Sequence, residues 1–199
     1  MSEIKLFNRW DFNVEVKDSG IKPYINLQPI TVPKTGGRYS KHPFYKSKMN
    51  IVERFVNKLM VPGHRGKKHL LTSGSVTGKT QTILNLVKEV FEKLEQRTKK
   101  NPIEVLVGAI GNAALREEIT SYQMGGIMVR KAVVTSPQRR VDLALTVIVQ
   151  SAYRKSFGKK LTMADALVDE IFYAYQNDAS KSEAIKERER VEREAGGAR

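Results

Sequence analysis

From residue 49 onward, apolar residues recur every three or four positions, which is the spacing of a helix with one buried face. Five such faces span 51–60, 83–94, 105–113, 141–152 and 166–172. Residues that favour helix ends separate these faces. The pattern therefore predicts five amphipathic helices, the second of them starting near residue 80.

Three of these helices have capping residues at their predicted starts. Asn101 precedes Pro102, Ser136 precedes Pro137, and Thr162 precedes the fifth apolar face. Asparagine, serine and threonine side chains accept hydrogen bonds from the first backbone N–H groups of a helix, and proline suits the first turn. These residues fix the expected helix boundaries.

A sixth helix is predicted for AIKERERVEREA at residues 184–195. This segment is polar nearly all round and carries opposite charges at helical spacing, such as Glu189 and Arg193. Between the third and fourth helices, EEITSYQMGGIMVRKAVVTS has β-branched residues around a Gly-Gly pair. That pattern predicts a β-hairpin at about 117–135, with its tip at the glycines.

Residues 1–45 lack the helical period. They contain Trp10 and four of the seven prolines, and FNVEV (12–16) and YINLQPITV (24–32) alternate weakly, which is compatible with short strands. We expect an extension that lies over a partner or over the rest of the protein, not a separate domain. The expected fold is mostly α: a helical bundle of about six helices at 46–199, with one protruding β-hairpin and this N-terminal extension.

The net charge of the chain indicates what kind of partner it binds. Over 199 residues the formal net charge is +14, and the pI is about 9.9. So basic a chain repels itself unless an anion shares the charge, and nucleic acid is the usual partner. An acidic membrane surface would favour a lipid-facing helix or a basic tail beside an apolar segment, and the sequence shows neither.

Cysteine usage and the N-terminus narrow the class further. The chain has no cysteine, which excludes disulfides, thiolate zinc sites and cysteine nucleophiles. No apolar run approaches the length of a membrane span, and MSEIKLFNRW has no signal-peptide core. We therefore expect a soluble intracellular protein.

The stretch TSGSVTGKTQTI ends like a nucleotide-binding P-loop, at Gly78-Lys79-Thr80. A P-loop requires a glycine and four further residues before Gly-Lys-Ser/Thr. That position is Ser73 here, and Gly74 comes one place too late. The chain also does not alternate strands with helices, as P-loop folds do. Lys79 and the helix start still favour an anion, which we interpret as an RNA phosphate.

No other catalytic or metal-binding pattern is present. The only histidines are His42, His64 and His69, and the latter two lie in a basic loop without a carboxylate to complete a metal site. Carboxylate pairs such as Asp165 with Asp169 lie on amphipathic surfaces, where we interpret them as solvated or paired with lysine. We expect no enzymatic activity, no metal and no cofactor.

Four stretches carry a resemblance to a known family. They are GKTQTILNLVKEVFEKLEQRTKKNPIEVLVGAIGNA (78–113), MGGIMVRKAVVTSPQRRVDLAL (124–145), MADALVDEIFYAY (163–175) and SEAIKERERVE (182–192). In their order and spacing, residues from about 46 to 199 resemble the universal small-subunit ribosomal protein seven. The long N-terminal extension and the loop LLTSGSVTGK are similar to the archaeal and eukaryotic branch.

This resemblance implies a structural constituent of the small ribosomal subunit, in the cytoplasm, without catalysis or cofactor. It implies direct binding to the 3′ major (head) domain of small-subunit rRNA and a role in organising head assembly. The hairpin and C-terminal helix would lie near mRNA and exit-site tRNA, beside another small-subunit protein on the platform. The end VEREAGGAR departs from bacterial members, because it lacks their longer basic and aromatic tail.

The positive charges concentrate in loops and at helix ends, which favours an rRNA-binding face. In RYSKHPFYKSK aromatic residues lie between the charges, a composition that suits phosphate contacts and base stacking. Arg139-Arg140 is the strongest candidate pair, since helix-start arginines can bind phosphates bidentately. The candidate rRNA-binding residues are Arg38, Lys41, Lys46, Lys48, Arg65, Lys67, Lys68, Lys79, Arg97, Lys99, Lys100, Arg139, Arg140, Arg154, Lys155, Lys159 and Lys160.

The predicted hairpin tip carries apolar side chains. They either pack on the rest of the protein or enter a cleft between ribosomal parts, and in the second case the cations on the returning strand would contact RNA. The candidate residues on the mRNA and tRNA side are Met124, Gly125, Gly126, Ile127, Met128, Arg130 and Lys131.

Two other functions agree with parts of the sequence. A P-loop-like nucleotide-binding enzyme is opposed by the motif spacing, and ATP turnover abolished by Lys79→Ala would support it. A basic DNA-binding helical module is opposed by the spread of charge over many loops. Equal affinity for duplex DNA and structured RNA would support that module.

Overall fold

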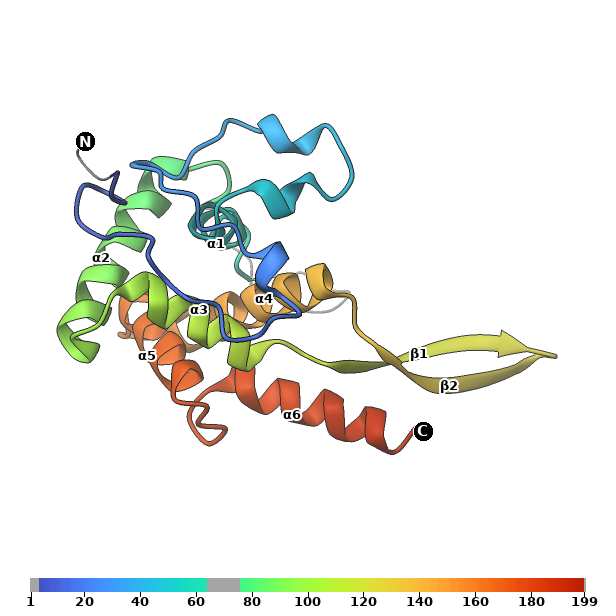
Figure 1. The fold of residues 1–199 in the computed structure, drawn as a ribbon. Coiled ribbons are helices and arrows are strands. Elements are labelled where there is room, and N and C mark those ends of the chain that lie inside the picture. Colours follow the sequence, from blue (N-terminus) through green and yellow to red (C-terminus); the bar gives the residue numbers. More distant parts are fainter. Residues whose placement is uncertain (1–3, 64–75, 199) are drawn as a thin grey trace.

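The fold is a bundle of α-helices from which one β-hairpin projects (Figure 1). The computed structural model describes residues 4–63 and 76–198. In these ranges the helices are α1 (Ile51–Leu59), α2 (Thr80–Thr98), α3 (Pro102–Ala113), α4 (Pro137–Ser156), α5 (Met163–Tyr175) and α6 (Glu183–Gly196), and the strands are β1 (Glu117–Met124) and β2 (Ile127–Val134). The predicted mostly α fold class is confirmed.

Side-chain caps fix two of the three predicted helix starts. The Asn101 side chain accepts a hydrogen bond from the N–H of Ile103 at 3.0 Å, and Thr162 Oγ1 accepts one from the N–H of Asp165 at 3.1 Å. At α4 the prediction was wrong in detail, because the Ser136 side chain makes no capping bond. The start of α4 is set instead by Pro137, whose fixed φ suits the first helical position.

The core forms around α5, which packs against α2, α3 and α4. Its buried face consists of Ala164, Ala166, Leu167, Val168, Ile171 and Ala174. On α3, Gly108 permits a close approach, since a Cβ there would lie 2.6 Å from Cδ2 of Tyr175. Such burial of apolar area is the main force that stabilises the bundle.

The N-terminal extension packs on the bundle. Leu6 and Ile21 are fully buried, and the Trp10 ring meets Phe91 of α2 edge-on, with ring centroids 5.6 Å apart. The indole N–H of Trp10 also donates to Glu95 at 3.2 Å. The extension therefore lies over the rest of the protein, one of its two expected positions.

The short strands considered for the extension do not form. Neither 12–16 nor 24–32 lies in a strand, and the nearest features are isolated bridges between Leu6 and Trp10 and between Asn26 and Asn50. The physical reason is that the apolar residues of the extension pack directly on helices. Phe12, Val16 and Ile25 are buried in the core without pairing to a sheet edge.

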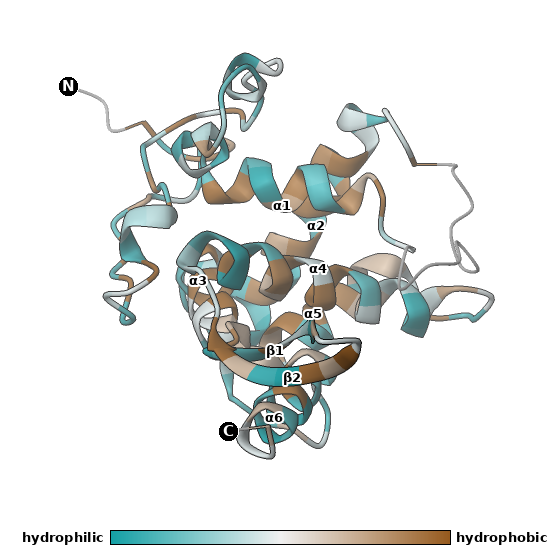
Figure 2. Ribbon diagram, turned by 90° about the vertical axis from the view of Figure 1, so that its right-hand side faces the viewer, coloured by the Kyte–Doolittle hydropathy of each residue, from teal (hydrophilic) through white to brown (hydrophobic). Residues whose placement is uncertain are grey.

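The hairpin is confirmed, with an antiparallel register from Glu117↔Val134 to Met124↔Ile127. At its tip Gly125 and Gly126 have φ values of 57° and 84°, which glycine adopts without steric cost and which match a two-residue hairpin turn. Seen end-on in Figure 2, the hairpin lies in front of the bundle and carries apolar segments. It is a projecting arm rather than part of the core.

Helix α6 runs beside the base of the hairpin (Figure 1), where Glu192 accepts a hydrogen bond from the N–H of Arg116 at 2.9 Å. It is mostly polar, as predicted, although Ile185 is fully buried. Its ion pairs at helical spacing join Arg188 to Glu192, and Arg190 to Glu187 and Glu194. The predicted partner of Arg193, Glu189, lies instead 3.5 Å from Arg188.

Candidate nucleic-acid interface

The hairpin tip presents exposed apolar side chains. Met124, Ile127 and Met128 are 64%, 70% and 68% exposed, so they do not pack on the rest of the protein. Arg130 and Lys131 on β2 are also exposed and form no ion pair with a described residue. The tip is thus free to contact another molecule.

At the hairpin base, the two arginines that start α4 are already paired. Arg139 donates from Nε and Nη2 to the two carboxylate oxygens of Glu118, both at 2.7 Å. Arg140 donates to the Leu115 carbonyl at 2.8 Å and to Asp18 at 2.6 Å. The bidentate geometry expected toward a phosphate is therefore made with a protein carboxylate.

These pairs shift the pKa values of their partners. Burial alone would raise the pKa of Asp18, but hydrogen bonds from the Gly20 N–H and from Arg140 lower it below its ordinary value. The hydrogen bond with Glu118 raises the pKa of Arg139. Both arginines lie in the first turn of α4, where the helix dipole disfavours cations, so the carboxylates also relieve that cost.

The basic segment at 38–48 divides into committed and available cations. Lys46 pairs with Asp142 of α4, and Lys48 lies over the Tyr45 ring at 3.9 Å. Arg38 and Lys41 have no ion-pair partner among the described residues. Arg38 and Lys41 are therefore available to a ligand, and Lys48, which is held by a ring contact and by no ion pair to a described residue, is available as well.

The same segment exposes an aromatic ring. Phe44 is 75% exposed and has a φ of 64°, an uncommon backbone conformation for a bulky side chain. Its carbonyl accepts hydrogen bonds from the N–H and hydroxyl of Ser47 at 3.1 and 2.8 Å. The turn thus holds the ring out toward solvent. The sequence pattern singled out this segment for its aromatic residues, but Phe44 was not among the candidate binding residues.

The turn between α2 and α3 has one anchored arginine and two lysines. Arg97 pairs with Asp169 at 2.5 Å and lies 4.0 Å from the centroid of the Phe172 ring. Burial lowers the pKa of Arg97, but the hydrogen bonds and charges of Asp169 and Tyr173 together raise it above its ordinary value. Lys100 donates to the Tyr175 hydroxyl at 3.0 Å, a bond that raises the pKa of Lys100.

Two further lysines at helix ends remain available. Lys99, which ends α2 with a φ of 54°, and Lys79, which precedes α2, form no ion pair within the described part of the chain. The other predicted cations of the loop before α2, namely Arg65, Lys67 and Lys68, lie outside the described residues.

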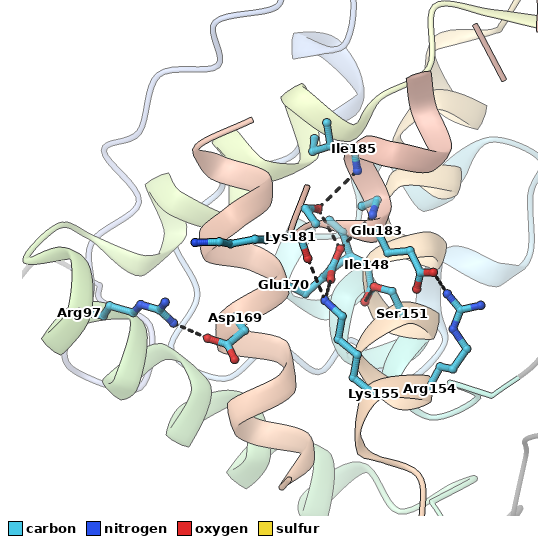
Figure 3. Close-up of polar contacts among 12 residues, drawn as sticks. Arg97, Ile148, Ser151, Arg154, Lys155, Asp169, Glu170, Lys181, Glu183 and Ile185 are labelled. Carbon is cyan, nitrogen blue, oxygen red and sulfur yellow. Dashed lines mark hydrogen bonds and ion pairs between the residues drawn. The ribbon is translucent and has the colours of Figure 1, made fainter. Parts of the chain in front are cut away.

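The C-terminal end of α4 is tied to α6 through a buried carboxylate (Figure 3). Glu170 of α5 is fully buried and accepts hydrogen bonds from Lys155 at 2.5 Å and from the Ser182 hydroxyl at 2.9 Å. It also accepts one from the N–H of Ala184 at 2.9 Å. Nearby, Arg154 pairs with Glu183.

Lys159 and Lys160, just beyond α4, are exposed and form no ion pair with a described residue. Two more exposed lysines approach this end of α4 from the start of α6, Lys181 and Lys186. Sequence analysis did not select them, although the segment SKSEAIK carries both. The missing signal was tertiary, because 159 and 181 are far apart in sequence.

No cluster of three or more His, Asp or Glu residues in the described ranges is arranged to hold a metal ion. Nor is any described helix both long and apolar enough to span a membrane. What the described surface offers is exposed cations and exposed apolar rings and side chains.

Comparison with known proteins gives a consistent result. A family model described as Ribosomal protein S7p/S5e matches residues 23–199. The chain is 47% identical over 198 residues to small ribosomal subunit protein uS7 of Nanoarchaeum equitans, a match that covers 99% of this chain and 100% of that protein. The chain is also similar to uS7 of Archaeoglobus fulgidus, with 45% identity over 99% of this chain and 96% of that protein. It is 43% identical to uS7 of Methanothrix thermoacetophila, over 98% of this chain and 100% of that protein.

Proposed function

Because the chain belongs to the ribosomal protein S7p/S5e family, in its archaeal-type branch, and is thus a non-enzymatic component of the small ribosomal subunit, we propose that it binds the 3′ major (head) domain of small-subunit rRNA directly and organises assembly of the head. The observation that carries the proposal is the set of exposed cations, at several loops and helix ends, that have no carboxylate partner in the described part of the chain. Uncompensated cations on a folded surface bind phosphates with release of counterions.

The structure divides the candidate residues by availability. The proposed primary contacts are the exposed cations that form neither an ion pair nor a ring contact with a described residue, and they are Arg38, Lys41, Lys79, Lys99, Lys159 and Lys160. Arg139, Arg140, Arg154 and Lys155 are tied to carboxylates. A paired arginine retains N–H groups that can reach a phosphate, so we propose a supporting role for these residues.

The hairpin is proposed to enter a cleft of the ribosome near mRNA and exit-site tRNA, beside a neighbouring small-subunit protein on the platform. Support comes from the exposed apolar tip, since a monomer in solution gains nothing from exposing Met124, Ile127 and Met128. Arg130 and Lys131 would contact RNA along the returning strand.

The RNA-binding unit is proposed to be 46–199, with 1–45 as an extension that adds contacts. In this extension Phe44 is proposed to stack on an unpaired base, because its ring is exposed and it lies in a basic segment whose Arg38 and Lys41 form no ion pair with a described residue. Replacing Phe44 by alanine should weaken RNA binding, and tryptophan should restore it.

The decisive experiment compares a transcript of the rRNA head domain with a shuffled RNA of equal length across a salt series. Charge alone predicts that both affinities fall together as salt rises. We expect the head-domain transcript to keep a large advantage at high salt. Coinciding curves would reject the proposal and leave a generic polycation, to be tested next for nucleotide and DNA binding.

A further inference from the structure

A polar cleft of about 450 Å³ lies between the end of α4 and the start of α6. Five cationic side chains line it, contributed by α4, the turn after it, the α5–α6 turn and α6: Arg154, Lys155, Lys159, Lys181 and Lys186. Glu183 is the one lining carboxylate among the described residues. The cleft therefore concentrates positive charge that the described chain does not balance.

Contacts within the chain leave three of these cations available. Arg154 is paired with Glu183, and Lys155 with the buried Glu170 (Figure 3). Lys181 forms no ion pair with a described residue: it lies 4.9 Å from the Tyr173 ring centroid, and its charge acts on Asp178 without a direct bond between the side chains. Lys159 and Lys186 have no ion-pair partner in the described ranges.

Helix electrostatics sharpen the imbalance. Lys186 lies in the first turn of α6, where the helix dipole disfavours a cation and favours an anion. The N–H groups of this turn are partly used, because Ala184 donates to Glu170 and Ile185 to Ser182. A bound anion would thus be held mainly by the lysines, and it would offset their mutual repulsion.

Resting on the proposed function, we propose that this cleft binds one backbone phosphate of the rRNA, with Lys159, Lys181 and Lys186 as its ligands. Every lining residue is polar or charged, whereas a protein partner needs an apolar or aromatic anchor at the centre of its interface. Lysines are point charges on flexible stems and suit a phosphate approached from several sides.

The test uses the full-length protein with head-domain and shuffled transcripts. The cleft variant carries Lys159→Ala, Lys181→Ala and Lys186→Ala. The matched control carries Lys17→Ala, Lys22→Ala and Lys88→Ala, which removes equal charge from exposed lysines without ion pairs in the described chain. Thermal unfolding verifies that each variant folds. If the triple variant does not fold, the single substitution Lys159→Gln at an exposed position replaces it.

We expect the cleft variant to bind the head-domain transcript about tenfold more weakly at about 0.15 M salt, with a salt slope lower by about one. The control should change less in both. Phosphate-ethylation interference should reveal one phosphate, or two adjacent ones, whose ethylation weakens binding of the unmodified protein but not of the cleft variant.

The outcomes separate the two proposals. If the unmodified protein does not prefer the head-domain transcript, the proposed function fails. If it does, but the cleft variant matches the control in affinity, slope and ethylation pattern, only the cleft inference fails. Two further results would overturn the cleft inference if the cleft variant leaves the ethylation pattern unchanged. Stabilisation of the unmodified protein, but not of the cleft variant, by inorganic phosphate would indicate a site for a free anion. Binding of polyglutamate by the unmodified protein, but not by the cleft variant, would indicate a site for an acidic protein.

Discussion

The cations at the two ends of α4 are used differently. At the N-terminal end both Arg139 and Arg140 are paired, with Glu118 and Asp18. At the C-terminal end Arg154 and Lys155 are paired with Glu183 and Glu170, but Lys159 and Lys160 beyond it have no carboxylate partner among the described residues.

The helix dipole contributes to the difference. Cations in a first turn are disfavoured by the dipole and gain from nearby carboxylates, whereas Lys159 and Lys160 lie beyond the end of α4, where the dipole imposes no such cost. A basic cluster in the sequence can therefore be structural or available for a ligand, and its position relative to a helix helps to determine which of these two roles it has.

Removing the buried carboxylate behind the C-terminal end should have the largest effect on stability. We expect Glu170→Ala to lower the free energy of unfolding by about 3 kcal/mol, because Lys155 loses its buried partner and the start of α6 loses two hydrogen bonds. Urea unfolding followed by circular dichroism measures the change. Glu189→Ala on α6, whose side chain is 43% exposed, is the control and should cost under about 0.5 kcal/mol. Equal losses in the two variants would contradict this account.

The adjacent arginines at the N-terminal end should differ from each other. The Arg140 side chain is 12% exposed, and we expect Arg140→Ala to lower the free energy of unfolding by about 2 kcal/mol, because Asp18 and the Leu115 carbonyl lose their donor. The Arg139 side chain is 55% exposed, so we expect Arg139→Ala, which breaks only a surface ion pair, to lower the free energy of unfolding by about 0.5 kcal/mol. Thermal and urea unfolding of the two variants provide the measurement, and a reversed order would show that the hairpin base depends on the Glu118 pair.

Acid should weaken the first half of α4 through Asp142. Although burial raises the pKa of this carboxyl, hydrogen bonds from Lys46 and Arg54 lower it below 3.8. A group with a lowered folded pKa contributes stability that is complete above its unfolded pKa and is lost as pH falls through the folded value. The melting temperature should therefore drop as pH is lowered below 3.8.

Asp142→Asn is the variant that isolates this contribution. It should be less stable than the unmodified protein at neutral pH, and its melting temperature should depend less on pH in the acid range. Parallel pH profiles for the two proteins would assign the acid sensitivity to other carboxyls.

The smallest change in stability is expected beyond the C-terminal end. Lys159→Ala with Lys160→Ala should alter the free energy of unfolding by only about 0.3 kcal/mol, the size of a favourable dipole interaction at a helix end. Its affinity for head-domain RNA should nevertheless fall several-fold, which the salt-series binding experiment measures. A large loss of stability with unchanged affinity would make these lysines structural.

Much of the fold was predictable because its signals are local. The apolar periodicity, the Asn101 and Thr162 caps and the Gly125-Gly126 turn each act over a few residues, so the helices and the hairpin followed from the sequence. The extension was harder, because weak alternation around Phe12 resembles a strand when the helical surface that buries it is unknown.

The candidate site was only partly predictable from the sequence. The sequence shows directly that the chain is basic, that its helix ends are charged and that its hairpin tip is apolar. Whether a given cation is free depends on carboxylates distant in the chain, such as Asp18 for Arg140. Likewise, the cleft between α4 and α6 could not be predicted locally, because Lys159 and Lys186, which both line it, are distant in the sequence. The helices, the hairpin and the excess of positive charge follow from residues that are close together in the chain. Which charges are paired depends on the folded arrangement, because Coulomb interactions act through distances in space and not along the chain.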